Sequence, residues 1–233
     1  MNLGVAVGLA LVGYLIGSIS FARMVGRRVV PDADLASTDL ELLGGATIEY
    51  GGVSATSIGA RTGPKWGIVV GVGDIAKAFI PTLAVRMLLP DDSYHLIMAV
   101  AVMVGHNYPV FHRFKGGRGQ SPLYGGVLAI DWVAIPATTI VGVGVGLFVM
   151  RDMLIAYALG QWLLIPWFAW RAGPPEVVYA VTVNLLYTIA MIPELRSYMA
   201  KRRAGELKSV TSWREFRTSH PAMGTGRIEA DDE

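Results

Sequence analysis

Apolar runs without a charged side chain constrain the fold of this chain more than any other feature. Crossing the hydrocarbon of a bilayer as a helix takes about 20 apolar residues. Residues 3–21 meet this requirement with no charge, and residues 66–89 meet it with three charges. Similar runs, free of Asp, Glu, Lys and Arg, cover residues 96–111, 132–150, 153–170 and 177–192. The sequence therefore predicts an all-α fold, a polytopic bundle of membrane-spanning helices.

The composition agrees with a membrane bundle. Only 16% of the residues are charged, against about 25% in soluble domains. The 28 glycines suit helices that approach closely in lipid, where small residues line helix interfaces. Cysteine is absent, which excludes disulfide bonds and thiolate metal sites. We expect one membrane domain over residues 1–204 and a polar cytoplasmic tail over residues 205–233, either an interfacial helix or disordered.

The basic residues predict how the bundle is oriented. Residues 122–130 are expected to form a short half-buried or re-entrant helix, and counting it gives about seven transmembrane helices. The first run lacks preceding basic residues and is expected to be a retained span rather than a signal peptide. By the positive-inside rule, the amino terminus lies outside the cell membrane and the carboxyl terminus in the cytoplasm. The cytoplasmic side then holds Arg23, Arg27, Arg28, Arg61, Lys65, Arg113, Lys115, Arg118, Arg196, Lys201, Arg202 and Arg203.

Two charges inside the second run are candidates for a functional role. Asp74 and Lys77 are three residues apart, so they share one face of a helix and can pair. Charges within a span are costly and face a bundle interior or an aqueous cavity. Either the pair only orients helices, or Lys77 points into a polar pocket and Asp74 orients it.

The segment 105–121 is the most polar part of the central region, and it follows an apolar run directly. Its core, residues 115–119, alternates glycine with Lys115 and Arg118. Glycines let backbone N–H groups turn toward an anion, and cations attract it over longer distances. The segment is therefore either a phosphate cradle or a turn at the membrane edge whose cations meet lipid headgroups.

Histidines in this segment do not suggest a metal site. His106 and His112 are six residues apart, which on a helix places them on different faces, and no carboxylate lies at ligand spacing. We expect no metal and no cofactor. The residues alone favour a structural role for His106, beside Asn107, in which it holds a loop by hydrogen bonds.

The first polar loop supplies hydroxyl groups ahead of the second run. Ser54, Thr56, Ser57 and Arg61 lie in a glycine-containing segment. The hydroxyls either orient a substrate or cap the helix that begins near Lys65. A Gly-x-Ser-x-Gly elbow is missing, so a serine hydrolase is not supported.

Taken together, these motifs resemble the PlsY family of bacterial membrane acyltransferases. Residues 105–119 look like the family pattern Gly-His-x-Phe/Tyr-Pro-Val-Phe, two variable residues, then Phe-Lys-Gly-Gly-Lys-Gly, with Arg118 replacing the second lysine. Residues 14–21 are similar to the family's first-span signature, and residues 73–81 to its Asp-x-x-Lys-Gly segment. Two departures stand out. The first loop is longer and keeps little of the family pattern, and Leu195 and Tyr198 stand where the third motif has His and Asn.

The resemblance implies transfer of a fatty acyl group from acyl phosphate to the 1-hydroxyl of glycerol-3-phosphate, giving lysophosphatidic acid. Its partners would be these two substrates and membrane lipid, with no nucleic acid. Alternatives are a diverged acyltransferase with another phosphorylated or polyol acceptor, or a non-catalytic membrane protein or carrier. A carrier is disfavoured because the sequence shows no internal repeat of the kind from which many transporters are built. The candidate catalytic residues are Thr56, Ser57, His106 and Asn107; the candidate substrate and phosphate ligands are Ser54, Arg61, Asp74, Lys77, Lys115, Gly116, Gly117, Arg118 and Gly119.

Overall fold

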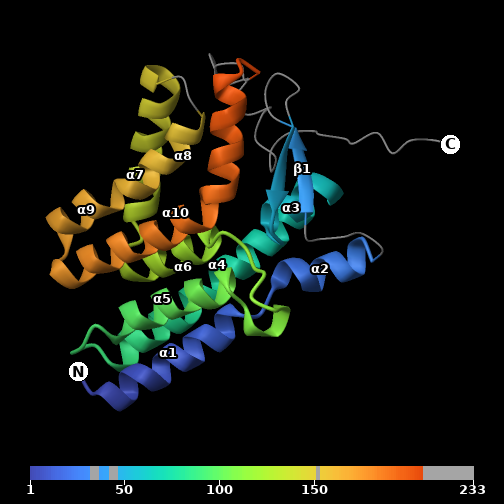
Figure 1. Cartoon of the computed structure of the whole chain (residues 1–233). Helices are drawn as coiled ribbons and strands as arrows, with labels where there is room; N and C mark the ends of the chain where they lie inside the picture. Colours follow the sequence, from blue (N-terminus) through green and yellow to red (C-terminus); the bar gives the residue numbers. More distant parts are fainter. Residues whose placement is uncertain (32–36, 42–46, 151–152, 207–233) are drawn as a thin grey trace.

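The computed structural model shows a bundle of helices with one small β-hairpin (Figure 1). It describes residues 1–31, 37–41, 47–150 and 153–206, so the expected tail lies almost wholly outside the described residues. The elements are α1 (Leu3–Gly17), α2 (Phe21–Val29), β1 (Ser37–Glu41), β2 (Thr47–Gly51), α3 (Ala55–Thr62), α4 (Pro64–Leu88), α5 (Tyr94–Asn107), η1 (Val110–His112), α6 (Gln120–Ile130), α7 (Ala134–Gly144), η2 (Val145–Met150), α8 (Met153–Trp162), α9 (Leu164–Arg171) and α10 (Pro174–Arg203).

Glycines allow the central helices to touch backbone to backbone. A Cβ added to Gly17 of α1 would lie 2.1 Å from the Val102 carbonyl oxygen of α5, and one added to Gly105 of α5 would lie 2.1 Å from the Tyr14 carbonyl oxygen. A Cβ on Gly125 of α6 would likewise lie 2.2 Å from a carbonyl oxygen of α4. Such close approach is the packing expected of helices in lipid, where small residues form the interfaces.

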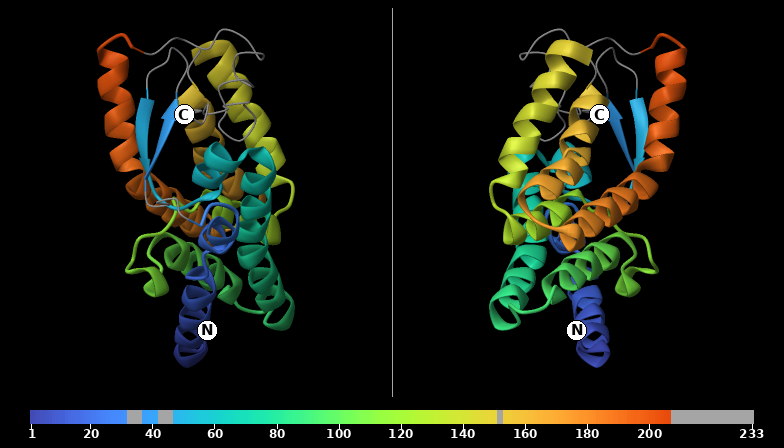
Figure 2. Two further views of the ribbon diagram at one scale, coloured as in Figure 1. Left: turned by 90° about the vertical axis from the view of Figure 1, so that its right-hand side faces the viewer. Right: turned by 90° about the vertical axis from the view of Figure 1, so that its left-hand side faces the viewer.

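Proline shapes the longest helix. Because Pro193 lacks an N–H and its ring meets the preceding turn, a helix bends at such a residue. The helix α10 contains Pro193 in its interior, and Figure 1 shows its two halves running in different directions. Figure 2 places the second half of α10 near the β-hairpin, at the end of the molecule away from the amino terminus. The bend therefore brings the carboxyl-terminal part of α10 to the end of the bundle that carries the β-hairpin.

Three helical stretches in the described chain are long and apolar enough to cross a membrane. They are Leu3–Val29, Pro64–Leu88 and Pro174–Arg203, and Ala134–Gly144 is a shorter apolar helix. Many large apolar side chains on these helices are exposed, including Leu11, Ile80 and Ile140. This outward apolar surface agrees with a multi-pass membrane protein.

The remaining expected spans are helical: most of 96–111 forms the single helix α5, whereas the other two are divided. The region 132–150 is divided between α7 and the π-helix η2, and the region 153–170 between α8 and α9. The expected short helix at 122–130 is present as α6. The number of spans stays a prediction.

The first polar loop differs from the expected loop or short helix. The strands β1 and β2 pair antiparallel, with Ser37 opposite Gly51 and Glu41 opposite Thr47. In β2, Ile48 and Tyr50 alternate with polar residues, a period of two that favours a strand. The helix α3, which follows, matches the short-helix part of the expectation.

Candidate functional site

The site is built around the loop that joins α5 to α6. After Asn107 ends α5, the chain passes through η1 and turns at Arg113 and Phe114, which have φ angles of 53° and 61°. The loop then returns to the helix it left, because the Gly117 N–H donates to the His106 carbonyl oxygen at 3.1 Å. Gly119, with φ 87°, immediately precedes α6. The loop thus doubles back onto the last turn of α5.

The glycines of this loop are required by close packing on α5. A Cβ on Gly116 would lie 2.0 Å from the His106 carbonyl oxygen, and one on Gly117 would lie 2.2 Å from the His106 Nε2 atom. A Cβ on Gly119 would lie 2.5 Å from the Asn107 Oδ1 atom. Since the Gly117 N–H donates to the His106 carbonyl oxygen of α5, that amide is not available to a substrate oxygen.

Lys77, Asp74 and His106 form a buried cluster behind the loop. The Lys77 Nζ atom lies 2.8 Å from Asp74 Oδ1 and 3.0 Å from His106 Nδ1. It also donates to the carbonyl oxygens of Gly17 at 3.1 Å and Ile19 at 2.7 Å. The Lys77 and Asp74 side chains are only 4% and 2% exposed. Lys77 therefore joins α4 to α5 and to the end of α1, and this geometry favours the first of the two interpretations of the pair.

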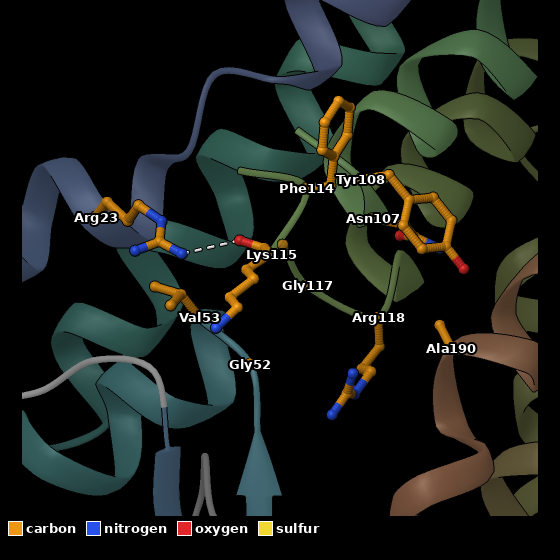
Figure 3. Close-up of a pocket in the computed structure, with 11 residues that line it drawn as sticks. Arg23, Gly52, Val53, Asn107, Tyr108, Phe114, Lys115, Gly117, Arg118 and Ala190 are labelled. Atoms are coloured by element: carbon orange, nitrogen blue, oxygen red, sulfur yellow. Dashed lines mark hydrogen bonds between the residues drawn. The ribbon is translucent and has the colours of Figure 1, made fainter. Parts of the chain in front are cut away.

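A pocket of about 300 Å³ lies in front of this loop (Figure 3). Four elements that are distant in sequence contribute to its wall: α2, the segment after β2, the α5–α6 loop and α10. Three cations, Arg23, Lys115 and Arg118, line it together with the polar side chains of Asn107 and Tyr108. The remaining lining residues are Gly52, Val53, Phe114, Gly116, Gly117 and Ala190.

Two of the pocket cations are held by specific contacts. The Arg23 Nη2 atom donates to the Lys115 carbonyl oxygen at 2.8 Å, which ties α2 to the loop. Arg118 forms an ion pair with Glu194 of α10, a carboxylate that is 5% exposed. Within the described chain, no ion pair or hydrogen bond involves the exposed Lys115 ammonium group. Of the three cations on the pocket wall, Lys115 is therefore the one best placed to bind an anionic ligand.

Burial and the positive charge around the pocket lower the pKa of a nearby histidine, His112. Partial burial lowers the pKa of His112 from its ordinary value, and the positive charges of Arg23, Arg27 and Lys77 lower it further. His112 is thus held toward its neutral form by an electropositive surrounding. Such a field attracts anionic ligands to the adjacent pocket.

The hydroxyls of the first polar loop are engaged in the helix cap of α3. Ser54 Oγ accepts from the Ser57 N–H at 3.3 Å, and Ser57 Oγ accepts from the Ser54 N–H at 2.9 Å. This reciprocal capping box buries Ser57 and leaves it 1% exposed. The pocket wall is formed instead by Gly52 and Val53, which immediately precede the cap.

The structure brings together some of the residues expected at the site and leaves others apart. On the pocket wall are Asn107, Lys115, Gly116, Gly117 and Arg118. Arg23, Tyr108, Phe114 and Ala190 line it without having been expected there. The expected residues outside the lining are Ser54, Thr56, Ser57, Arg61, Asp74, Lys77, His106 and Gly119.

The elements that build the pocket all lie in a region that matches a known protein family. The family model described as glycerol-3-phosphate acyltransferase matches residues 7–201, which include every element from α2 to α9 and most of α1 and α10. The chain belongs to the glycerol-3-phosphate acyltransferase family. The loop of the pocket lies in the middle of the matched region, and Arg23 and Ala190 fall within it nearer its two ends.

Curated members of the glycerol-3-phosphate acyltransferase family align over most of the chain. The glycerol-3-phosphate acyltransferase of Pseudomonas entomophila is 30% identical over 182 residues, which are 78% of this chain and 88% of that protein. The enzyme of Ralstonia pickettii is 31% identical over 207 residues, covering 84% and 90% of the two chains.

Solved structures of a family member share the fold. PlsY (YgiH), an integral membrane glycerol-3-phosphate acyltransferase, superposes in its glycerol-3-phosphate form with a TM-score of 0.69 and 24% identity. The alignment covers 88% of this chain and 94% of that chain. A lysophosphatidic acid form of the same protein gives a TM-score of 0.68 at 23% identity.

Proposed function

We propose that this protein transfers a fatty acyl group from acyl phosphate to the 1-hydroxyl of glycerol-3-phosphate in the pocket beside Lys115. The product would be lysophosphatidic acid, an intermediate of phospholipid biosynthesis. The observation that carries the proposal is the three-cation pocket, which is built on the loop 105–121 within the region that matches the family. Both substrates carry phosphate, and a pocket with three cations suits such ligands.

The reaction requires little from the protein beyond binding and positioning. The acceptor oxygen attacks the acyl carbonyl carbon, the bond from that carbon to the phosphate oxygen breaks, and the departing phosphate takes the hydroxyl proton. Acyl phosphate is already activated, so juxtaposition of two bound molecules supplies much of the rate. Cations beside the carbonyl stabilise the negative charge that develops on its oxygen.

Each part of the site has a distinct role in this proposal. Lys115 and Arg118 bind phosphate oxygens, and Arg23 binds them or fixes the loop through the Lys115 carbonyl. The cluster of Lys77, Asp74 and His106 positions the loop from behind and does not touch substrate. The exposed apolar side chains of Phe111 and Phe114 border the loop and suit an acyl chain that arrives from the lipid.

We further propose that the pocket faces the cytoplasm from the cell membrane. Arg27, Arg28 and Arg113 surround the pocket end of the bundle and are exposed. This concentration of positive charge supports a cytoplasmic position by the positive-inside rule. Glycerol phosphate is a water-soluble metabolite, and it would reach the pocket from that side.

A different polyol phosphate remains a second candidate for the acceptor. Glu194 places a carboxylate against Arg118, and the neighbouring Leu195 and Tyr198 replace the His and Asn of the family's third motif. A negative group beside a phosphate-binding cation favours an acceptor with additional hydroxyl groups over one with additional negative charge.

Purified protein tests the function directly. Palmitoyl phosphate is supplied as the donor with glycerol-3-phosphate and a panel of other polyol phosphates, and acylated product is measured. We expect Lys115→Ala to reduce kcat/KM about 10- to 100-fold, since it removes a charge-assisted contact to phosphate. Lys65→Ala, which removes an exposed cation outside the pocket wall, is the matched control.

The outcomes separate the function from the site. Absence of turnover with every acceptor would contradict the proposed activity. Turnover by the unchanged protein together with full activity of Lys115→Ala would contradict the site while leaving the activity intact. Preference for another polyol phosphate would assign the chain to the second candidate.

A further inference from the structure

One pocket side chain is buried without a hydrogen-bond partner. Asn107 is 4% exposed, and neither its Oδ1 nor its Nδ2 atom has a partner among the described residues. A buried amide without partners is costly, and folded proteins keep few of them. Because Asn107 also lines the pocket, its amide is placed where a bound ligand can supply what the protein does not.

Among uncharged side chains of the described residues, the same property at other positions has no connection with the pocket. In the described chain, buried and unpartnered atoms also occur on the uncharged side chains of Thr82, His95, Gln161 and Asn184. None of these four residues lines the pocket wall. Within the described part of the chain, Asn107 is therefore the residue whose amide is both unpartnered and on the wall of this pocket.

Packing fixes the position of this amide in the absence of hydrogen bonds. A Cβ on Gly119 would lie 2.5 Å from Oδ1 and 3.1 Å from Nδ2 of Asn107, and a Cβ on Gly116 would lie 2.7 Å from the Asn107 carbonyl oxygen. The loop can approach this closely because it carries glycine at both positions. In the view of Figure 3, Asn107 stands with Tyr108 and Ala190 on one side, and Arg23 and Lys115 stand on the other. Since both amide atoms lack partners, either orientation of the amide presents an acceptor and two donors to a ligand.

We propose that the Asn107 amide recognises the 2-hydroxyl of the polyol phosphate acceptor and makes the site selective for it. This inference rests on the proposed acyl transfer. An amide offers one acceptor and two donors, whereas an ionised phosphate only accepts hydrogen bonds. The pocket cations already suit the phosphate, but only a hydroxyl can donate to Oδ1 while accepting from Nδ2. The amide thus complements the part of the acceptor that the cations do not.

The chemistry of transfer decides which hydroxyl the amide holds. The 1-hydroxyl must give its proton to the departing phosphate as its oxygen forms the new ester bond. A proton held by Oδ1 of Asn107 would not be available for that step. The amide is therefore assigned to the neighbouring 2-hydroxyl, which is chemically unchanged by the reaction and serves for recognition alone.

A substrate lacking only that hydroxyl provides the test. Glycerol-3-phosphate is compared with 3-hydroxypropyl phosphate, which keeps the phosphate and the acylated hydroxyl, using palmitoyl phosphate as donor. We expect the unchanged protein to prefer glycerol-3-phosphate by about 10-fold or more in kcat/KM, because the analogue leaves the buried amide unpaired. In Asn107→Leu, activity on glycerol-3-phosphate should fall and the preference should drop to about one.

Controls distinguish recognition from a structural effect. The preference is a ratio measured on one protein sample, so a misfolded fraction cancels, and Asn107→Ala provides a second variant with the same expected ratio. Thr82→Val removes another buried unpartnered group, outside the pocket, and should leave the preference unchanged.

Each outcome has a defined meaning. An Asn107→Leu variant that loses activity equally on both acceptors, or keeps the full preference, would overturn the assignment of the amide to the 2-hydroxyl. Absence of a preference in the unchanged protein would overturn it as well. Absence of acyl transfer to either acceptor would instead contradict the proposed function on which the inference rests.

Discussion

Lys77 shows how one residue can hold three helices together. Its ammonium group has three protons, and four acceptor atoms lie within 3.1 Å of it: two carbonyl oxygens, Asp74 Oδ1 and His106 Nδ1. The carbonyls belong to Gly17, the last residue of α1, and to Ile19 just beyond it. Because the ring of His106 in turn packs against Gly117, a buried charge in α4 helps to position the loop between α5 and α6.

Replacing Lys77 should therefore destabilise the fold. We expect Lys77→Met to reduce the free energy of unfolding by about 3 to 5 kcal/mol, because Asp74 becomes a buried charge without its cation. The measurement is thermal unfolding of the purified protein in detergent. The combined change Asp74→Leu with Lys77→Met should recover part of the loss, since no unpaired charge is left. If both variants unfold at the temperature of the unchanged protein, the cluster does not hold the helices.

At the scale of elements, close packing between helices depends on where a glycine stands and not on how many glycines a helix contains. On α1, Gly17 lies against the backbone of α5, whereas a Cβ on Gly8 of the same helix would meet no atom within 4 Å. The two positions share a helix and an amino acid but differ in what surrounds them. They therefore separate interhelical packing from helix propensity.

We expect alanine at these two positions to have opposite effects. Gly17→Ala should cost about 1 to 3 kcal/mol or more, because its Cβ would lie 2.1 Å from the Val102 carbonyl oxygen and α1 must move away from α5. Gly8→Ala should be neutral or stabilise by up to about 1 kcal/mol, the difference in helix propensity. Thermal unfolding in detergent measures both. Equal effects at the two positions would contradict the close packing of α1 on α5.

The site could be predicted from the sequence only where it is continuous in the chain. The loop 105–121 combines its motif in one stretch, and Asn107, Lys115 and Arg118 of that loop do line the pocket. Arg23 and Ala190 reach the same pocket from α2 and α10, which no local pattern connects to the loop. In the first polar loop, spacing alone could not decide between a helix cap and a substrate contact. The structure shows that Ser54 and Ser57 cap α3, whereas α4, the helix expected near Lys65, begins without a side-chain cap.

At the scale of the whole molecule, the two ends of the bundle differ in character. The amino-terminal ammonium group lies 3.2 Å from Asp92 Oδ1, so the amino terminus lies at the turn between α4 and α5. The pocket lies at the other end of α1, beyond which α2 supplies Arg23. Apolar runs located the helices, but the break between α1 and α2 inside the run 3–21 and the π-helix η2 within 132–150 depend on packing between helices. The length of an apolar run does not reveal such breaks.

The helix α4 offers a direct test of the proposed orientation. Its 25 residues span about 37 Å, more than the ~30 Å thickness of the hydrocarbon. Lys65 near its start and Asp91 just after its end are both exposed, and the chain has no cysteine of its own. Single Lys65→Cys and Asp91→Cys variants therefore report on opposite ends of one helix, with the cysteine-free protein as the blank.

We expect a membrane-impermeant maleimide to label Asp91→Cys in bacterial cells whose outer membrane has been removed. Lys65→Cys should react only after the remaining membrane is made permeable, because the positive-inside rule places that end in the cytoplasm. The reverse pattern would put the pocket on the outer side of the membrane, where cytoplasmic glycerol phosphate cannot reach it. Labelling of both variants before the remaining membrane is made permeable would show that α4 does not cross, and the membrane arrangement proposed for the remaining helices would have to change with it.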